Sequence, residues 1–286
     1  MDEQVPSMNS NSEPLVSVIM SVFNGEQYLQ QAIDSILSQT YSHWEFIIID
    51  DASNPATKSI LMPFKNDLRF KIISNDTNQG LTKNLNRAID LCEGEFIARM
   101  DGDDISLPER FSHQVIFLHQ YPQTDAAFGF VELIDENGYP VGYWPDDRKA
   151  NTYHKIKQRL PFSNCMAHPT VLIRKEVLQN YKYNEEQIHS QDWDLWLRMV
   201  SERRIIDKIN NTVLLYRIHN NSVTKISNKK SVFLKKNQAY QWYLRFVWKE
   251  KRINFFNFRV FIGFLLNKIK LGLSRIKKYF SLKNYS

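Results

Sequence analysis

Cysteines and long apolar runs are scarce in this sequence. Its 286 residues include two cysteines, Cys92 and Cys165, which lie too far apart for any metal-binding or redox spacing. We expect both to be reduced, buried thiols. No apolar stretch approaches the roughly 18 to 20 residues that span a bilayer, which argues against a transmembrane helix. Residues 1–14 are polar and lack the basic and apolar regions of a signal peptide, so we expect a flexible N-terminus on a cytoplasmic protein.

A glycine-rich dinucleotide loop is also absent. The first turn of the chain, from Ser21 to Glu26, contains the single glycine Gly25 and no G-x-G-x-x-G pattern. That pattern lets the backbone approach a pyrophosphate closely, so its absence excludes a dinucleotide-binding fold. Any bound nucleotide would instead be held by carboxylates and a metal ion.

The rest of the composition is that of an ordinary globular protein. Hydrophobic residues make up 43% and charged residues 24% of the chain, whose length suits one large domain or one domain with an appendage. The formal net charge is +6. A basic balance is compatible with nucleic acid, anionic lipid or phosphorylated ligands, and only the distribution of the charge along the chain can distinguish them.

Strand-like and helix-like segments alternate through the first part of the chain. Leu15–Val22 is an uninterrupted aliphatic run, typical of a strand buried on both faces, and apolar residues recur with helical spacing after Glu26. This alternation with short turns predicts an α/β fold with a mostly parallel central sheet flanked by helices. The other predicted strands are Trp44–Ile49, Phe70–Ser74, Phe96–Ala98 and Ala126–Ile134, and the other predicted helices are Ala56–Lys65, Leu81–Cys92, Pro108–Gln120 and Ala150–Leu160.

Three carboxylates crowd together immediately after one predicted strand. Asp101, Asp103 and Asp104 follow Phe96–Ala98, and such a cluster repels itself unless a positive charge lies nearby. Hard divalent cations take oxygen ligands, and Mg²⁺ sites often combine carboxylates with substrate phosphates. The cluster therefore indicates a metal and diphosphate site, and the alternative is an acidic turn capping the helix that begins at Pro108.

Two further polar turns are expected at the same edge of the sheet. Ser21–Asn24 and Asp50–Asp51 each follow a predicted strand, as the acidic cluster does. Ligands of parallel α/β sheets bind beyond the carboxyl ends of the strands. The convergence of three polar turns strengthens the prediction of a nucleotide-phosphate site there.

Four ordered motifs together resemble family 2 of the inverting glycosyltransferases. They are VSVIMSVFNGEQYL, FIIIDDAS, NQGLTKNLNRAI and ARMDGDDISLPERF, and the resemblance runs from about Leu15 to Asn220. It implies a nucleotide-sugar-binding fold of the GT-A type over residues 15–224, with a nucleotide-sugar half at 15–110 and an acceptor half at 111–224. It also implies transfer of a sugar from a nucleoside diphosphate, most often UDP, to an acceptor hydroxyl.

The resemblance assigns residues to the nucleotide sugar and to a metal ion. Ser21 and Asn24 would lie along the uridine and its ribose, and Asp51 would accept the uracil N–H. Asp103 would bind the Mn²⁺ or Mg²⁺ ion that bridges the diphosphate, with Asp101 on the metal or the ribose. Glu26 and Asn86, in the first and third motifs, are further nucleotide-sugar candidates, whereas Asp104 is expected to be structural.

The second half of the chain contains the predicted general base. The family has a Glu-Asp pair before a Leu-Trp helix, and this sequence has Gln191-Asp192. Direct displacement at the anomeric carbon needs a carboxylate to take the acceptor's proton, which the resemblance assigns to Asp192. The alternative for Asp192 is a helix cap. Asp194 is expected on the helix surface or as a second cap.

Two histidines are further candidates. His168 is expected either to contact the acceptor or diphosphate or to be structural. His219 lies in a segment, Tyr216–Ser222, that resembles the family's closing loop, where a basic residue can stabilise the departing diphosphate.

The charge and composition change at Lys225. Residues 225–286 combine many lysines and arginines with an aromatic-rich segment, contain no proline, and are expected to form long helices. This composition suits the surface of an anionic membrane. The alternatives are a helical pair packed on the catalytic domain and, less favoured, nucleic-acid binding, since no nucleic-acid motif is present.

Together these features predict an inverting, metal-dependent hexosyltransferase. We expect it to transfer a hexose from a UDP-sugar to a lipid-diphosphate-linked saccharide, on the cytoplasmic face of the inner membrane. The product would be a bacterial surface polysaccharide such as O-antigen, capsule or lipopolysaccharide. The competing hypotheses are a non-catalytic nucleotide-sugar-binding module docked on the membrane and a sugar nucleotidyltransferase.

Overall fold

The N-terminal half of the central sheet is parallel. In a computed structural model that describes residues 13–187, 189–219 and 232–283, the first four strands lie side by side in the order β3-β2-β1-β4. All three pairings among them are parallel. Of the segments for which the sequence made predictions, residues 1–12, 188, 220–231 and 284–286 lie outside the described part. The strands are β1 (Val16–Val22), β2 (Trp44–Asp50), β3 (Phe70–Ser74) and β4 (Phe96–Arg99).

The second half adds strands of mixed direction to the same sheet. The order continues from β4 through β8, β6 and β9 to β5, with β7 paired to β6. The pairings of β8 with β4 and β6 are antiparallel, whereas β6 and β9 are parallel, so the whole sheet is mixed. These strands are β5 (Ile105–Ser106), β6 (Ala126–Ile134), β7 (Pro140–Tyr143), β8 (Leu172–Arg174) and β9 (Ile206–Arg217).

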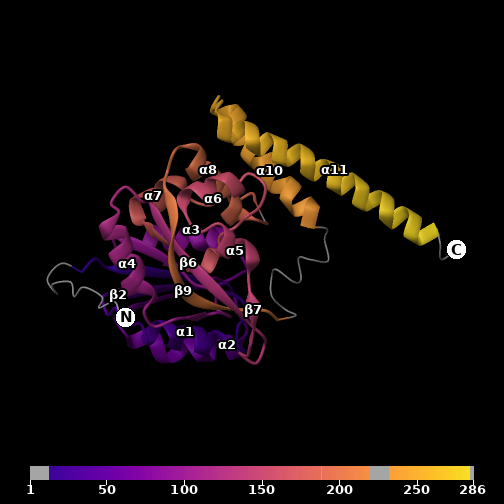
Figure 1. Ribbon diagram of the computed structural model, residues 1–286. Helices are drawn as coiled ribbons and strands as arrows, with labels where there is room; N and C mark the ends of the chain where they lie inside the picture. The colour runs from indigo at the N-terminus through magenta and orange to yellow at the C-terminus, as the bar shows by residue number, and fades with distance from the viewer. Residues whose placement is uncertain (1–12, 188, 220–231, 284–286) are drawn as a thin grey trace.

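Helices cover both faces of the sheet, which confirms the predicted α/β class (Figure 1). Alternate residues of β1 enter two separate cores: Ile19 packs with α3, α7 and α8, whereas Val18 and Met20 pack with α1 and α4. The uninterrupted aliphatic run in β1 follows from this double burial. The helices beside the sheet are α1 (Leu29–Leu37), α2 (Pro55–Leu61), α3 (Leu81–Leu91), α4 (Arg110–Gln120), α5 (Pro145–Lys149), α6 (Tyr153–Arg159), α7 (Lys175–Tyr181) and α8 (Gln191–Ser201), with 3₁₀ turns η1 (Met62–Asn66) and η2 (His168–Thr170).

Some element boundaries differ from the prediction for local reasons. The helix predicted over Ala56–Lys65 is split at Met62 into α2 and η1, because Pro63 cannot donate a backbone hydrogen bond inside an α-helix. The side chain of Asn54 caps α2 by accepting from the Thr57 amide. Both cysteines are free and buried, as expected.

The C-terminal segment forms two long helices that pack against the sheet-bearing part of the chain. α10 (Val232–Lys249) and α11 (Phe255–Lys283) form a hairpin over α8 (Figure 1). The Tyr240 ring lies 4.9 Å from that of Trp193, and the Tyr240 hydroxyl donates to the Pro161 carbonyl over 2.9 Å. Tyr243 and Val260 belong to the same buried core as α8. Among the described residues, no helix is long and apolar enough to cross a membrane.

Candidate active site

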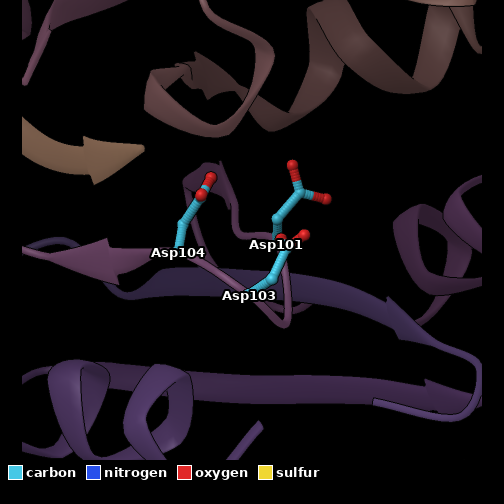
Figure 2. Close-up of side chains that lie close together, drawn as sticks. All are labelled: Asp101, Asp103 and Asp104. Atoms are coloured by element: carbon cyan, nitrogen blue, oxygen red, sulfur yellow. The ribbon is translucent and has the colours of Figure 1, made fainter. Parts of the chain in front are cut away.

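Three aspartates converge on the loop after β4. Asp101, Asp103 and Asp104 each offer a carboxylate oxygen, and these oxygens all lie within 4.8 Å of one another (Figure 2). The loop leaves the carboxyl end of β4, beside the carboxyl end of β1, as the parallel register of the two strands requires. The predicted acidic cluster is therefore a compact group of negative charges at the edge where ligands of such sheets bind.

Asp101 is held by the residue that ends β4. The guanidinium of Arg99 makes a two-pronged ion pair with the Asp101 carboxylate, and the Arg99 side chain is itself buried. Burial raises the pKa of Asp101 to about 6; the Arg99 charge opposes this shift, and the charges of Asp103 and Asp192 add to it. Arg99 thus offsets only part of the cluster's negative charge.

Asp104 is the most deeply buried of the three. Its Oδ1 accepts a hydrogen bond of 2.9 Å from the Arg217 amide at the end of β9, so it joins two strands as expected of a structural residue. Its Oδ2 is buried and has no hydrogen-bond partner among the described residues. Burial and the charges of Asp103 and Asp101 raise its pKa well above the ordinary range. Asp104 therefore contributes an unsatisfied charge to the cluster as well as a structural contact.

The end of β9 brings a histidine to the cluster. His219 Nε2 lies 2.9 Å from Asp103 Oδ2, and its ring packs against Tyr28 with the ring centroids 5.1 Å apart. Arg217 fixes this segment by donating from Nε to the Asp103 carbonyl over 2.9 Å. The structure places His219 beside Asp103, within reach of any ion that Asp103 holds.

This group of side chains fits a hard divalent cation. It supplies three carboxylates and one imidazole, and one buried carboxylate oxygen lacks a partner among the described residues. Burial, together with the repulsion between the carboxylates, raises the pKa of Asp101 and of Asp104. Oxygen-rich sets of this kind suit Mg²⁺ or Mn²⁺, which need few protein ligands when phosphates supply others.

The loop after β2 organises the neighbouring edge. Asp51 accepts backbone hydrogen bonds from Gln79 (2.7 Å) and Gly80 (2.9 Å) and a side-chain bond from Asn75 (2.8 Å). Burial alone would raise the pKa of Asp51, but these hydrogen bonds lower it below its ordinary value. Asp51 is therefore an ionised acceptor that holds the loop over residues 75–80.

The other predicted nucleotide residues lie around the same edge. Ser21 accepts a 3.0 Å hydrogen bond from Asn84, and Asn24, in the left-handed backbone region, accepts one of 2.9 Å from the Asn54 amide. Glu26 accepts from the Thr57 hydroxyl over 2.8 Å. The Ser21 contact joins β1 to α3, and the other two join the turn after β1 to the start of α2.

Asn86 lies elsewhere on α3. Its side chain is buried, donates to the Tyr183 carbonyl and accepts from the Tyr183 amide, each over 2.9 Å. The structure thus brings Asn86 together with the segment before α8 and gives it no contact with Asp51 or the acidic cluster.

Asp192 occupies the first turn of α8 and faces the acidic cluster. The helix cap is Ser190 rather than Asp192. Asp192 accepts a 2.7 Å hydrogen bond from the Asn164 side chain, and burial raises its pKa above the ordinary value despite that bond. Its charge raises the pKa of Asp101, so the two carboxylates, far apart in sequence, lie close enough to interact electrostatically. A raised pKa makes a carboxylate a better proton acceptor.

Asp194 and His168, two further polar residues of this half, are both buried. The prediction for Asp194 is wrong: its carboxylate is buried and pairs with Arg198 one turn along α8 at 2.9 Å. His168 fits the structural alternative, because it is buried with Nε2 2.7 Å from the Tyr183 hydroxyl, and burial lowers its pKa well below the usual range.

Sequence reasoning missed three residues that position the site. Arg99 neutralises part of the cluster, Arg217 holds Asp103 and Asp104, and Asn164 orients Asp192. Of these three, Arg99 was predictable from the sequence, because an arginine at the end of a buried strand, just before three aspartates, needs a negatively charged partner. The other two depend on contacts between distant segments.

Comparisons with known proteins identify the relatives of this chain. Residues 17–182 match the family model for glycosyl transferase family 2. The chain is 32% identical over 246 residues to an uncharacterised glycosyltransferase of Methanocaldococcus jannaschii, covering 84% of this chain and 81% of that protein. It is 38% identical over 215 residues to the O-antigen biosynthesis glycosyltransferase WbnJ of Escherichia coli, covering 74% of this chain and 82% of WbnJ.

Solved structures with low sequence identity share the fold. TarS of S. aureus aligns with a TM-score of 0.65 at 19% identity, covering 89% of this chain and 72% of that one. The mannosyltransferase PcManGT from Pyrobaculum calidifontis, solved with GDP-Man and Mn²⁺, aligns with a TM-score of 0.63 at 16% identity, covering 82% of this chain and 65% of that one. In the TarS complex with UDP, the chain spans 64% of the solved protein.

Proposed function

Because the chain belongs to glycosyltransferase family 2, we propose that it transfers a hexose from a UDP-sugar to a saccharide hydroxyl with inversion. The observation that carries this proposal is the proximity of Asp192 to the acidic cluster. The cluster suits a divalent cation, and Asp192 has a raised pKa and a charge that raises the pKa of Asp101. Inverting transfer needs this arrangement, since the nucleophile must approach from the face opposite the leaving diphosphate.

The metal would be held by Asp103 and His219, with Asp101 and Asp104 beside them. A Mn²⁺ or Mg²⁺ ion bound there would offset the negative charge of the donor's diphosphate as it leaves. Arg99 adds a fixed, buried positive charge next to the cluster. The mannosyltransferase structure with GDP-Man and Mn²⁺ supports this use of a divalent cation in the fold.

Asp192 would take the proton of the acceptor hydroxyl. Asn164 holds one of its carboxylate oxygens at 2.7 Å, which fixes the side-chain orientation. Its raised pKa makes proton transfer more favourable, while Arg99 nearby keeps the ionised form accessible. Gln191 occupies the position where the family has a second carboxylate and has no role in this proposal.

UDP is the proposed nucleotide. TarS has been solved with UDP and with UDP-GlcNAc. In this chain Asp51 stays ionised at the nucleotide edge, and its Oδ2 accepts a hydrogen bond from the Gly80 amide. A second lone pair on that oxygen would accept the uracil N–H, and Ser21 and Asn24 would line the uridine.

The proposed acceptor is a saccharide on a lipid diphosphate carrier, used in surface polysaccharide synthesis. The relative WfgD of Escherichia coli, 30% identical over 192 residues, is named as a glucosyltransferase acting on α-D-GlcNAc-diphosphoundecaprenol. WbnJ is named for O-antigen biosynthesis. These names support a lipid-linked saccharide as the acceptor. The C-terminal helices support it as well, because they would hold the enzyme at the membrane that carries such an acceptor.

One face of α11 suits a membrane surface. Phe258, Phe261, Leu265, Ile269 and Leu273, here called the apolar stripe, recur at helical spacing, and each is at least 44% exposed. They lie opposite the buried face that packs on α10 and the domain. From Lys251 to Ser286 the sequence has nine lysines and arginines and no aspartate or glutamate. An exposed apolar face flanked by cations fits the interface of an anionic bilayer. We propose that residues 225–286 hold the enzyme peripherally on the cytoplasmic face of the inner membrane.

The direct test is UDP release from a panel of UDP-hexoses with Mn²⁺ and a GlcNAc-diphosphate acceptor bearing a short alkyl chain. We expect transfer from one donor, loss of activity with a chelator, and an inverted anomeric configuration in the product by NMR. UDP binding without transfer from any donor would favour the non-catalytic binding module instead.

A further inference from the structure

A cavity of about 510 Å³ lies beside α8, between the segment that precedes this helix and α10. One wall comes from Glu186 and Gln187, and the other comes from Asn237, Gln241 and Trp242. The cavity contains none of the nucleotide or metal residues described above. It lies between the predicted acceptor half, residues 111–224, and α10.

The cavity is connected directly to the cap of the helix that carries Asp192. Gln187 Nε2 donates to the carbonyls of His189 and Ser190, over 2.9 and 3.0 Å. Ser190 is the cap of α8, and Asp192 is the second residue of that helix. A ligand seated in the cavity would therefore lie next to the start of the helix that carries the proposed base.

Two amide oxygens in the cavity walls lack partners. Gln187 is buried, and its Oε1 has no hydrogen-bond partner among the described residues. The same holds for Asn237 Oδ1, on the opposite wall. A buried carbonyl oxygen without a donor costs free energy, so a turn of either side chain that brings its oxygen to a hydrogen-bond donor of a ligand in the cavity would be favoured. Hydroxyl groups are such donors.

The charge of the lining argues against an anionic ligand. Glu186 and Lys235 carry one charge of each sign, and the lining also includes four side-chain amides, on Gln187, Asn237, Gln238 and Gln241. A diphosphate or a nucleic-acid backbone would need an excess of cations. A ring such as that of Trp242 offers an apolar surface to a sugar ring, while the amides match its hydroxyls.

From these features we infer that the cavity is a subsite for a neutral sugar residue of the acceptor saccharide. The inference rests on the proposed function for the identity of that saccharide. It assigns to α10, a helix outside the segment that matches the family model, part of the acceptor specificity. The sugar would occupy the cavity while the reacting hydroxyl lies near Asp192.

Binding can be measured without donor, metal or turnover. Saturation-transfer NMR would be recorded on the full chain with the neutral methyl glycosides of glucose, galactose, mannose, N-acetylglucosamine and rhamnose, and with anionic methyl glucuronide. We expect at least one neutral glycoside to bind, and Trp242→Ala to weaken it about tenfold. Trp248→Ala, an exposed tryptophan on the same helix outside the cavity, is the matched control and should bind as the parent does.

A second variant blocks the cavity rather than removing a contact. Gln238→Cys on exposed α10 surface, labelled with a maleimide, should abolish glycoside binding, whereas labelled Lys249→Cys should not. The native thiols Cys92 and Cys165 are buried, so labelling stays selective. Unchanged UDP binding would show that each variant is folded.

The subsite is wrong if no neutral glycoside binds the parent, if binding survives both Trp242→Ala and the labelled Gln238→Cys, or if methyl glucuronide binds best. Because the samples contain no donor, these outcomes are separate from those for transfer. A chain that binds glycosides but releases no UDP would contradict the proposed function alone.

Discussion

His219 Nε2 lies 2.9 Å from Asp103 Oδ2, although 116 residues separate the two side chains in sequence. The contact closes the acidic loop after β4 against the end of β9. We therefore propose that His219 contacts the cation held by Asp103 as well as the diphosphate.

Removing Asp103 should weaken metal binding more than removing His219 does. Asp103→Ala should abolish Mn²⁺-dependent transfer, because the most exposed carboxylate of the cluster is lost. His219→Ala should raise the Mn²⁺ concentration needed for half-maximal activity about tenfold, since an imidazole contributes less than a carboxylate to a hard cation. Metal titrations of UDP release measure both effects. His113→Ala, a histidine on α4, is the control, and equal metal dependence of His219→Ala and the parent would exclude His219 from the site.

Metal affinity should fall as the pH falls through about 6. Burial raises the pKa of Asp101 to about 6, so protons compete with the cation in this range, and burial also raises the pKa of Asp104. The stability of the metal-free protein should change with pH in the opposite direction, falling as the pH rises. A carboxyl whose folded pKa is raised binds more protons when folded, so its contribution to stability is present at low pH and is lost as the pH rises through the folded pKa. Calorimetric Mn²⁺ titrations between about pH 5 and 7.5 test the first statement, and constant affinity over that range would contradict it.

The charge of Asp104 should destabilise the metal-free protein at neutral pH. Asp104→Asn keeps an oxygen that can accept from the Arg217 amide but removes the buried negative charge. We expect the metal-free Tm to rise by roughly 2–4 °C, and the gain from added Mn²⁺ to shrink. Thermal melts with and without metal would measure this. A lower metal-free Tm would mean that the charge is already compensated within the protein.

The apolar stripe of α11 should determine binding to anionic vesicles. Replacing Phe261, Leu265 and Ile269 together by serine removes three exposed apolar side chains and leaves the charge unchanged, so vesicle affinity should fall at least about tenfold. Leu68→Ser, at a fully exposed leucine between η1 and β3, is the matched control. Vesicle flotation measures binding. The membrane proposal for α11 would be untenable if the triple variant floated as the parent does.

Two glycines of α11 should respond oppositely to alanine. A Cβ on Gly263 would lie 2.3 Å from the Pro161 carbonyl oxygen, so Gly263→Ala should cost about 1–3 kcal/mol of unfolding free energy. Nothing lies within 4 Å of a Cβ on Gly272, and Gly272→Ala should stabilise the helix by about 0.5–1 kcal/mol. Denaturant unfolding would compare them. Equal effects would mean that α11 does not pack on the domain in this way.

The sequence predicted the parts of the fold that rest on local pattern. β1 and β2 lie within two residues of the predicted bounds because their uninterrupted runs reflect burial on both faces. β5 was missed because a strand of two residues carries no periodicity. β9 was missed because polar Asn210 and Asn211 interrupt its apolar pattern. The acidic cluster was predictable from residue spacing, whereas Arg217 and Asn164 act through contacts that only the folded chain creates.

We propose that Asp192 removes the acceptor's proton opposite a metal-bound diphosphate. The most direct measurement compares the parent with Asp192→Asn, which keeps the size of the side chain and an oxygen for Asn164. We expect kcat for transfer to fall by about 10²–10⁴-fold while UDP-sugar and Mn²⁺ affinities stay within about twofold. Transfer by Asp192→Asn at nearly the parent's rate would exclude Asp192 as the base.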